Sequence, residues 1–124
     1  MAGDGGKGAA TNESRFRAGD PALDVDVRVD PGRDGLGGAV MTLRGDLDLV
    51  NRALLVAQLE AVTSRWRHVV VDLDGVSLLA ACAVSELVRV RDRVARDGGT
   101  LVLRTGRGTP SAMVLGALRV AVVE

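Results

Sequence analysis

The stretch VVVDLDGVSLLAACAVSEL, Val69 to Leu87, carries the features that decide the fold. The mostly apolar run over residues 68–73 is typical of a central β-strand that is covered on both faces. A turn and a helix follow, and the helix start reads Ala-Ala-Cys-Ala at residues 80–83. A helix start exposes unpaired N–H groups that Ser, Thr, Asp or Asn side chains normally satisfy. The sequence therefore predicts a strand, a turn and a helix that lacks the usual polar cap.

Composition limits the kinds of protein that this chain can be. Its 124 residues, 47% of them hydrophobic, suit one domain with one core. Basic and acidic residues balance at 16 each, and aromatic residues are almost absent, which argues against nucleic acid as a partner. One cysteine makes no internal disulfide, and no apolar run approaches the roughly 20 residues that span a membrane. We expect a cytoplasmic protein.

The N-terminal residues differ in composition from the rest of the chain. Residues 1–21 are rich in Gly and polar residues and lack the apolar middle of a secretory signal. Such a segment cannot bury enough apolar surface to offset its ordering entropy. We therefore expect a disordered tail over residues 1–21 and one folded domain over residues 22–124.

The folded part begins with a predicted β-hairpin. Apolar and charged residues alternate over residues 22–30, as in a strand with one face in water. The turn-rich stretch PGRDGLGG, residues 31–38, leads into a second apolar run at residues 39–45. Its glycines do not make a phosphate-binding loop, because a strand and not a helix follows them. We expect two strands joined by a mobile loop.

Two longer helices are predicted next. Asn51 can cap a first helix that runs to about Thr63. Its apolar face recurs at i, i+4 and i+7 and comprises Leu55, Leu59 and Val62. The second helix ends at Gly98 and Gly99, and its apolar side comprises Val84, Leu87, Val88, Val94 and Ala95.

The C-terminal third is predicted to hold a strand, a short helix and a last strand. TLVLRT, residues 100–105, is an apolar strand, and Thr109 with Pro110 makes a good cap and first residue for a short helix. LRVAVVE, residues 118–124, is expected to end the chain as a strand. Strands alternating with helices indicate an α/β fold, with a hairpin at one end of the sheet and right-handed crossovers beyond it.

This order of elements, together with three motifs, resembles the STAS domain of anti-sigma factor antagonists across about residues 23–122. The motifs are RGDLDLVNRALLVAQL (44–59), VVVDLDGVSLL (69–79) and ARDGGTLVLRT (95–105). The resemblance implies a STAS-like mixed sheet of four to five strands with an N-terminal hairpin and helices packed on it. It also implies a partner, an anti-sigma factor or a related kinase-like protein.

The resemblance gives the uncapped helix a meaning. In that family the helix start reads Asp-Ser-Ser or Asp-Ser-Thr followed by Gly, and a hydroxyl there is phosphorylated by the partner kinase. The corresponding positions here are Ala80, Ala81, Cys82 and Ala83. Ala81 has no acceptor atom, and Cys82 has a thiol that a Ser/Thr kinase does not normally use. The phosphoacceptor-equivalent positions, Ala81 and Cys82, therefore lack a hydroxyl.

Other residues join these four in the expected partner-binding surface. Asp48 matches the family's aspartate after the second strand, where it either caps the entry to the first helix or contacts the partner. Glu86 and Arg89 belong either to a solvated helix face with ion pairs or to the docking surface. The expected set comprises Asp48, Ala80, Ala81, Cys82, Ala83, Glu86 and Arg89. Asp72 and Asp74 flank the same loop and are expected to satisfy its backbone rather than to act as catalysts.

A reactive thiol is the main enzymatic alternative. A cysteine at a helix N-terminus can become nucleophilic, but a thiol enzyme usually needs a base. The one histidine, His68, begins the central strand, and the six strand steps to Asp74 already span roughly 20 Å. We expect Cys82 to be a small buried residue, and we expect no catalytic residue, metal site or cofactor.

The sequence leaves two functions open. The preferred one is a non-enzymatic binding module that captures an anti-sigma factor and, without a phosphoacceptor, lacks the usual off-switch or has diverged toward another partner. The alternative is a STAS adaptor subunit of another complex, such as a lipid-transport ATPase. A third possibility, small-ligand or nucleotide binding by a STAS fold, has no support in the sequence beyond the breadth of functions within the family.

Overall fold

A computed structural model describes residues 23–30 and 37–124 of the chain. The elements follow one another as β1 (Leu23–Asp30), β2 (Gly38–Leu47), α1 (Arg52–Arg65), β3 (His68–Leu79), α2 (Ala81–Arg96), β4 (Thr100–Arg104) and α3 (Pro110–Ala117). The described residues thus form a mixed α/β fold with a four-stranded sheet, which confirms the predicted class. The expected tail over residues 1–21 and most of the expected loop lie outside the described residues.

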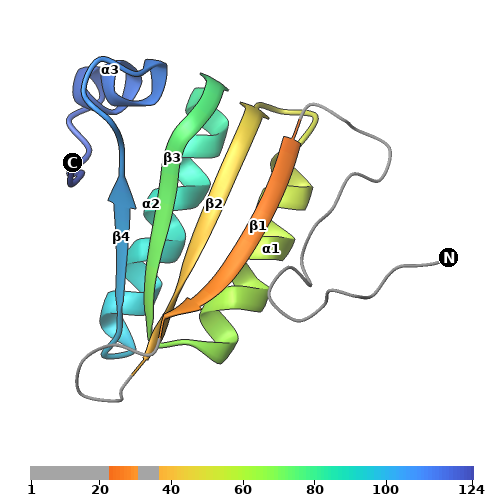
Figure 1. The fold of residues 1–124 in the computed structure, drawn as a ribbon, viewed down its shortest axis with the longest axis vertical. Helices are drawn as coiled ribbons and strands as arrows, with labels where there is room; N and C mark the ends of the chain where they lie inside the picture. Colours follow the sequence, from red (N-terminus) through yellow and green to blue (C-terminus); the bar gives the residue numbers. More distant parts are fainter. Residues whose placement is uncertain (1–22, 31–36) are drawn as a thin grey trace, which may run out of the picture.

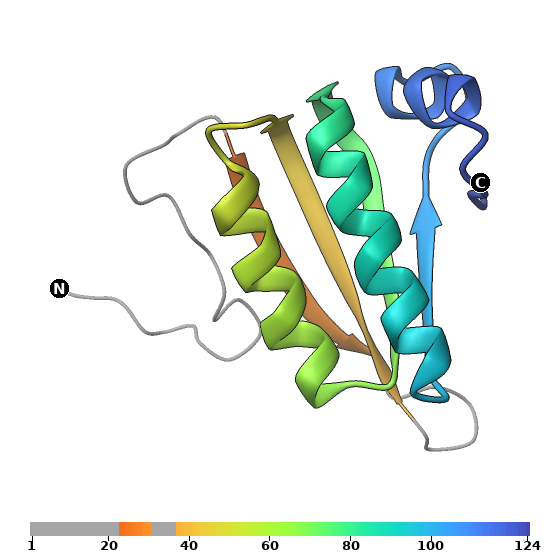
Figure 2. The same cartoon turned by 180° about the vertical axis from the view of Figure 1, so that it is seen from behind.

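The strands lie side by side in chain order, β1-β2-β3-β4. β1 and β2 pair antiparallel, which confirms the hairpin, and β2–β3 and β3–β4 pair parallel. Both parallel crossovers advance in the same direction across the sheet, and such crossovers share one hand. For this reason α1 and α2 lie together on one face of the sheet (Figures 1 and 2).

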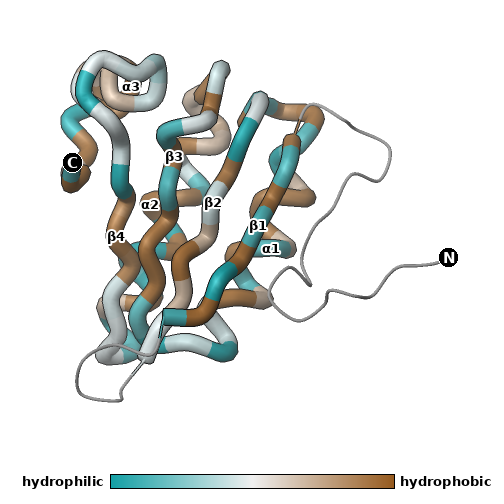
Figure 3. The backbone as a smooth tube through the Cα atoms, in the orientation of Figure 1, coloured by the Kyte–Doolittle hydropathy of each residue, from teal (hydrophilic) through white to brown (hydrophobic). Residues whose placement is uncertain are grey.

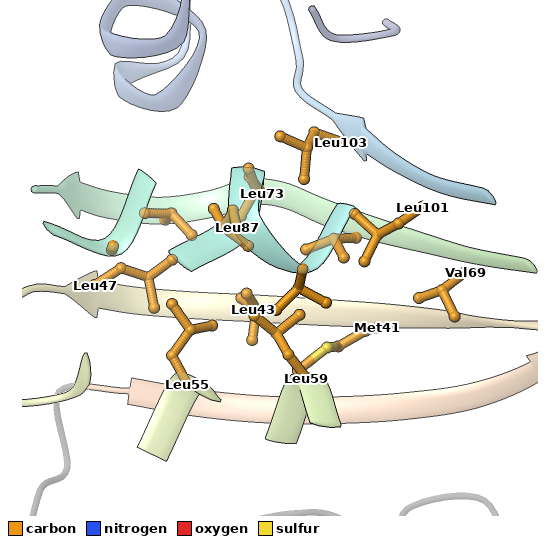
Figure 4. Packing of buried hydrophobic residues seen from close by; sticks show 14 of the residues in the cluster. Met41, Leu43, Leu47, Leu55, Leu59, Val69, Leu73, Leu87, Leu101 and Leu103 are labelled. Carbon is orange, nitrogen blue, oxygen red and sulfur yellow. The ribbon is translucent and has the colours of Figure 1, made fainter. Parts of the chain in front are cut away.

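The core lies between these two helices and the sheet. Leu55, Leu59 and Val62 of α1 are buried, as their spacing predicted. In Figure 4 the leucines of α1 and Leu87 of α2 reach the apolar side chains of β2 and β3. The alternation along β1 is visible as alternating colours in Figure 3, and its inward residues Leu23, Val25 and Val27 are buried.

The other face of the sheet corrects one prediction. The central strand was expected to be covered on both faces, but neither α1 nor α2 lies over the second face (Figure 1). Val40, Val70 and Val102, which share that face, are half-buried rather than buried. The apolar run of β3 reflects its central position in the sheet, whereas the direction of the crossovers leaves one face open.

β3 is also longer than predicted, because the expected turn after Leu73 continues as strand to Leu79. The pairing with β2 shifts register between Thr42 and Arg44 and again between Gly45 and Asp46. A Cβ at Gly75 would lie 2.8 Å from Cγ of Arg44, so glycine lets the two strands stay paired there.

The buried residues of α2 agree with the predicted apolar side except at two positions. Val84, Leu87 and Val94 are buried, and Val88 packs against the core. Ala95 is exposed, and Val90 is buried in its place, because the core-facing stripe is centred nearer Val90 than the sequence pattern suggested. The predicted stop is confirmed by Gly98, which has φ 89° and donates its N–H to Ala95 O, while Gly99 N–H donates to Val94 O.

The C-terminal end is partly as predicted. Thr109 caps α3 by accepting a hydrogen bond from Ala112 N–H at 3.2 Å, and Pro110 is the first helical residue. The predicted last strand over residues 118–124 is wrong, because Val123 makes a single isolated bridge to Arg104. Arg119 takes a positive φ of 60° after α3 and turns the backbone out of a regular strand path.

Candidate functional site

The carboxyl ends of β2 and β3 bring two loops together at one edge of the sheet. Leu47 pairs with Leu79, and Ala80 N–H donates to Leu47 O at 2.8 Å. The segments that begin at Asp48 and at Ala80 therefore start side by side, and α1 and α2 begin from the same edge (Figure 2). We call the surface formed by these two segments and the adjacent strand end the loop edge; it comprises the half-buried Asp48 and the exposed Leu49, Val50, Leu78 and Ala81.

The N-terminus of α2 has the backbone of a capped helix without the cap. Ala80 occupies the N-cap position with φ −82° and ψ 156°, and no described side chain accepts a hydrogen bond there. Its carbonyl oxygen accepts from Ala83 N–H at 3.0 Å and Val84 N–H at 3.1 Å. The helix start is thus well formed, and its free N–H groups and positive dipole end point toward the loop edge.

The four residues at this helix start differ in exposure. Ala81 is exposed, Ala80 and Cys82 are half-buried, and Ala83 is fully buried at 0%. Ala83 therefore cannot touch a partner directly, and we leave it out of the proposed contact surface. Cys82 is less buried than expected.

His68 lies far from Cys82 along β3. Nδ1 of His68 lies 3.0 Å from Thr100 Oγ1 at the opposite end of that 12-residue strand. A strand of this length rises by roughly 36 Å. The geometry therefore agrees with the expectation that these two residues form no Cys–His pair.

Asp48 organises the loop that leads into α1. Its Oδ1 accepts a hydrogen bond from Asn51 N–H at 3.1 Å, so the capping role considered for Asp48 is present in the structure. Asn51 occupies the N-cap position of α1 as predicted, but it does not cap with its side chain. Instead its Nδ2 donates to Asp46 O at 2.7 Å, and the side chain is buried with 2% exposure. Asn51 thereby ties the loop to the end of β2.

Glu86 and Arg89 take part in ion pairs that join α1 to α2. Arg89 lies 2.9 Å from Glu86 one turn earlier and 3.9 Å from Glu60 on α1. Arg52 of α1 lies 3.8 Å from Glu86, and Arg93 pairs with Glu60. The Arg89–Glu86 pair within α2 is of the kind that the ordinary interpretation expected, whereas the pairs between α1 and α2 were not anticipated. A contact of Glu86 and Arg89 with a partner stays a prediction.

Asp72 satisfies a backbone N–H group, as expected, but it lies within β3 rather than beside a loop, and it faces the open side of the sheet. Its Oδ1 accepts from Asp74 N–H at 2.9 Å, and its Oδ2 pairs with Arg104 at 2.9 Å. Burial raises the pKa of the Asp72 carboxyl, but these hydrogen bonds and the charges of Arg104 and Arg44 outweigh burial and hold that pKa below its usual value. Asp72 is therefore an ionised structural partner of Arg104.

Three apolar residues at the loop edge were missed by the sequence analysis. Leu49 is 72% exposed, Val50 is 79% exposed and Leu78 is 48% exposed. Leu78 pairs with Asp46 next to the loop that carries the other two. Large apolar side chains gathered in water are typical of protein contact sites. The sequence did contain a sign of the exposed Leu49 and Val50. The segment LDLV, residues 47–50, lies between a strand and the polar start of a helix, so its last two apolar residues belong to neither predicted apolar face.

Comparison with known protein families identifies the family of this chain. A model of the STAS domain matches residues 26–115. The chain belongs to the STAS-domain family. The match covers the sheet except for the first residues of β1, and it covers both long helices and most of α3. The loop edge is therefore part of the STAS domain itself.

Two solved structures share the fold of this STAS domain. One is an anti-sigma factor antagonist from Mycobacterium paratuberculosis, with a TM-score of 0.62 and 20% identity over 82% of this chain and 85% of that chain. The other is the anti-sigma factor antagonist SpoIIAA in its unphosphorylated form, with a TM-score of 0.56 and 11% identity over 79% of this chain and 87% of that chain. No curated protein sequence matches the chain. None of the helices in residues 23–30 and 37–124 is long and apolar enough to cross a membrane.

Proposed function

We propose that this STAS domain is a non-enzymatic binding module of the anti-sigma factor antagonist kind, which acts in the cytoplasm and captures a kinase-like anti-sigma factor. The observation that carries the proposal is the loop edge. There, apolar Leu49, Val50 and Leu78 are exposed beside the uncapped start of α2. The two structural neighbours are anti-sigma factor antagonists, which supports the same kind of function.

The chemistry of the loop edge suits protein contact. Its apolar side chains supply area to bury, and Asp48 holds the loop in one shape through its bond to Asn51 N–H. A preformed loop loses little conformational entropy on binding, which favours affinity. The Arg52–Glu86 and Arg93–Glu60 pairs join α1 to α2 behind the loops.

The proposal includes the absence of a phosphorylation switch. Ala81 and Cys82 occupy the positions where the family carries its hydroxyl, and neither has one. A phosphate at this helix start would be stabilised by the free N–H groups yet would place about −2 charges within the partner surface. Without it, the module stays competent to bind its partner.

Binding is tested by isothermal titration of the domain with kinase-type anti-sigma factors from the same organism. Leu49→Asp and Val50→Asp should each weaken binding by about tenfold or more, because burying one such side chain is worth about 1.5 to 3 kcal/mol. Val29→Asp is the matched control, since Val29 is 50% exposed but lies near the far end of β1. An equal loss in all three variants, or unchanged binding in the first two, would contradict the proposed surface.

Phosphorylation is tested separately by intact mass spectrometry. The wild-type chain, incubated with ATP and an anti-sigma kinase that binds it, should gain no phosphate. Replacing Ala80→Asp, Ala81→Ser and Cys82→Ser should restore phosphorylation and weaken partner binding. A fourth change, Ala83→Gly, completes the family motif but removes a buried methyl group, so it is compared with the triple variant.

Phosphorylation at another serine would place the switch elsewhere in the domain. Ser77 in β3 and Ser85 in α2 are both exposed near the loop edge. A phosphate on the wild-type chain mapped to either serine would mean that the switch has moved rather than disappeared.

A further inference from the structure

A pocket of about 390 Å³ lies on the open face of the sheet, away from α1 and α2. Its lining comprises Arg28, Val29, Asp30, Val40, Thr42, Arg44, Asp72 and Arg104. Three of these eight residues are arginines, and they come from three different strands. Neither the loop edge nor the helix layer shares a residue with this pocket.

The strand register explains why the arginines meet. Arg28 of β1 lies opposite Val40 of β2, Thr42 lies opposite Asp72 of β3, and Asp72 lies opposite Arg104 of β4. Neighbouring strands are about 4.8 Å apart, and every second residue of a strand points to the same face. Long guanidinium side chains on such a face can therefore converge on one small ligand.

The arginines of the pocket differ in how their charge is used. Arg104 is held by Asp72 at 2.9 Å. The side chains of Arg28 and Arg44 make no hydrogen bond or ion pair with any other residue in the part of the chain that the structure describes, whereas Asp30 already has an interaction of its own. Two guanidinium groups thus remain available, and a guanidinium is a planar fork that matches the oxygens of a carboxylate or phosphate.

The surface beside the arginines is apolar. A second pocket of about 320 Å³ is lined in part by Val40, Val70 and Val102, and Val40 belongs to both pockets. These three valines lie in register across β2, β3 and β4. An apolar group laid along this row would have its charged end at the arginines.

We propose that the open face of the sheet binds a small organic oxyanion, a phosphate monoester or a carboxylate whose apolar body rests on Val40, Val70 and Val102. Arg28 and Arg44 hold the oxyanion, and the Thr42 hydroxyl lies between them to donate a further hydrogen bond. Asp72 fixes Arg104 at the side of the pocket. This site is independent of partner binding at the loop edge.

The test is a two-dimensional amide NMR titration of the full chain at low salt with phenyl phosphate, benzoate and inorganic phosphate as probes. Phenyl phosphate or benzoate should shift the amide signals of β2, β3 and β4 around Thr42 and Asp72 and saturate at about millimolar concentrations. Inorganic phosphate should bind at the same amides but more weakly, because it has no apolar body. Shifts scattered over the surface, or none at all, would overturn the proposal.

Exposed arginines allow matched variants. Arg28→Ala and Arg44→Ala should each weaken phenyl phosphate binding by about tenfold, because each removes a charge-assisted hydrogen bond. Arg96→Ala is the control, since Arg96 is exposed on α2 on the other side of the sheet. All three side chains lie outside the core, so folding is preserved and the comparison stays valid. An equal effect of Arg96→Ala would show attraction by overall charge and would overturn the site.

Discussion

Ala80→Asp should stabilise the protein by about 1 to 2 kcal/mol. Ala80 already has the extended N-cap backbone, with φ −82° and ψ 156°, so a side-chain acceptor can be added without moving the chain. Replacing Ala by Asp at an N-cap is worth about 0.5 to 2 kcal/mol, and the negative charge at the helix dipole adds about 0.3 to 1 kcal/mol. The half-buried position limits the sum, because part of the carboxylate loses hydration.

The assay is thermal and urea unfolding at pH 7, followed by far-UV circular dichroism. A gain of this size should raise Tm by about 3 to 12 °C for a domain of this length. Ala81→Asp is the matched control, because it places the same charge one residue later, where it meets the dipole but does not occupy the cap position. It should gain only about 0.3 to 1 kcal/mol.

A second variant tests the same reasoning with the opposite sign. Thr109 Oγ1 accepts a hydrogen bond from Ala112 N–H at the start of α3, so Thr109→Ala should cost about 0.5 to 2 kcal/mol. If Ala80→Asp is no more stable than Ala81→Asp while Thr109→Ala is destabilised, the start of α2 does not offer its N–H groups to a cap. The argument for an anion-accepting helix start at the loop edge would then fail.

Three further outcomes are expected from urea unfolding. Leu87→Ala should cost about 2 to 5 kcal/mol because Leu87 is fully buried, whereas Leu49→Ala, at a site 72% exposed, should stay within about 0.5 kcal/mol; similar values would mean that the face of α2 is misassigned. Asp72→Asn should cost about 0.5 to 1 kcal/mol at neutral pH. Since the folded state lowers the pKa of Asp72 from 3.8, that difference should be present above pH 3.8 and vanish as the pH falls through the folded-state pKa; a constant difference would contradict the ionised pair. Arg119→Gly should stabilise by about 0.5 to 1 kcal/mol, because Arg119 has a φ of 60° at the end of α3, and a loss would show that its side chain matters more than its backbone.

Local pattern was enough to predict most elements of this protein. The alternation in β1, the i, i+4, i+7 spacing of Leu55, Leu59 and Val62, and the glycine stop at Gly98 all act within one element. The missing cap at Ala80 was likewise visible, because a capping acceptor belongs to the residue itself. The motifs in chain order were enough to indicate the STAS family, which the match to residues 26–115 confirms.

Contacts that form only in the folded chain decided the rest. Asn51 was expected to cap α1, yet its side chain donates to Asp46 O, because a buried amide takes the partner that the folded loop presents. The expected last strand reduces to the bridge between Val123 and Arg104, since the direction of the chain after α3 depends on the backbone of Arg119. The pairing of Glu60 with Arg93 joins residues 33 positions apart, a distance at which no sequence period applies.

The sequence by itself therefore determined the α/β class, the family and the absence of a hydroxyl at Ala81 and Cys82, because these follow from residue identity and short-range spacing. The tertiary structure alone decided that both long helices share one face, since this depends on the direction in which successive strands are added to the sheet. That direction leaves the second face open. Arg28, Arg44 and Arg104 meet on it because register, and not sequence spacing, sets which side chains of separate strands are neighbours.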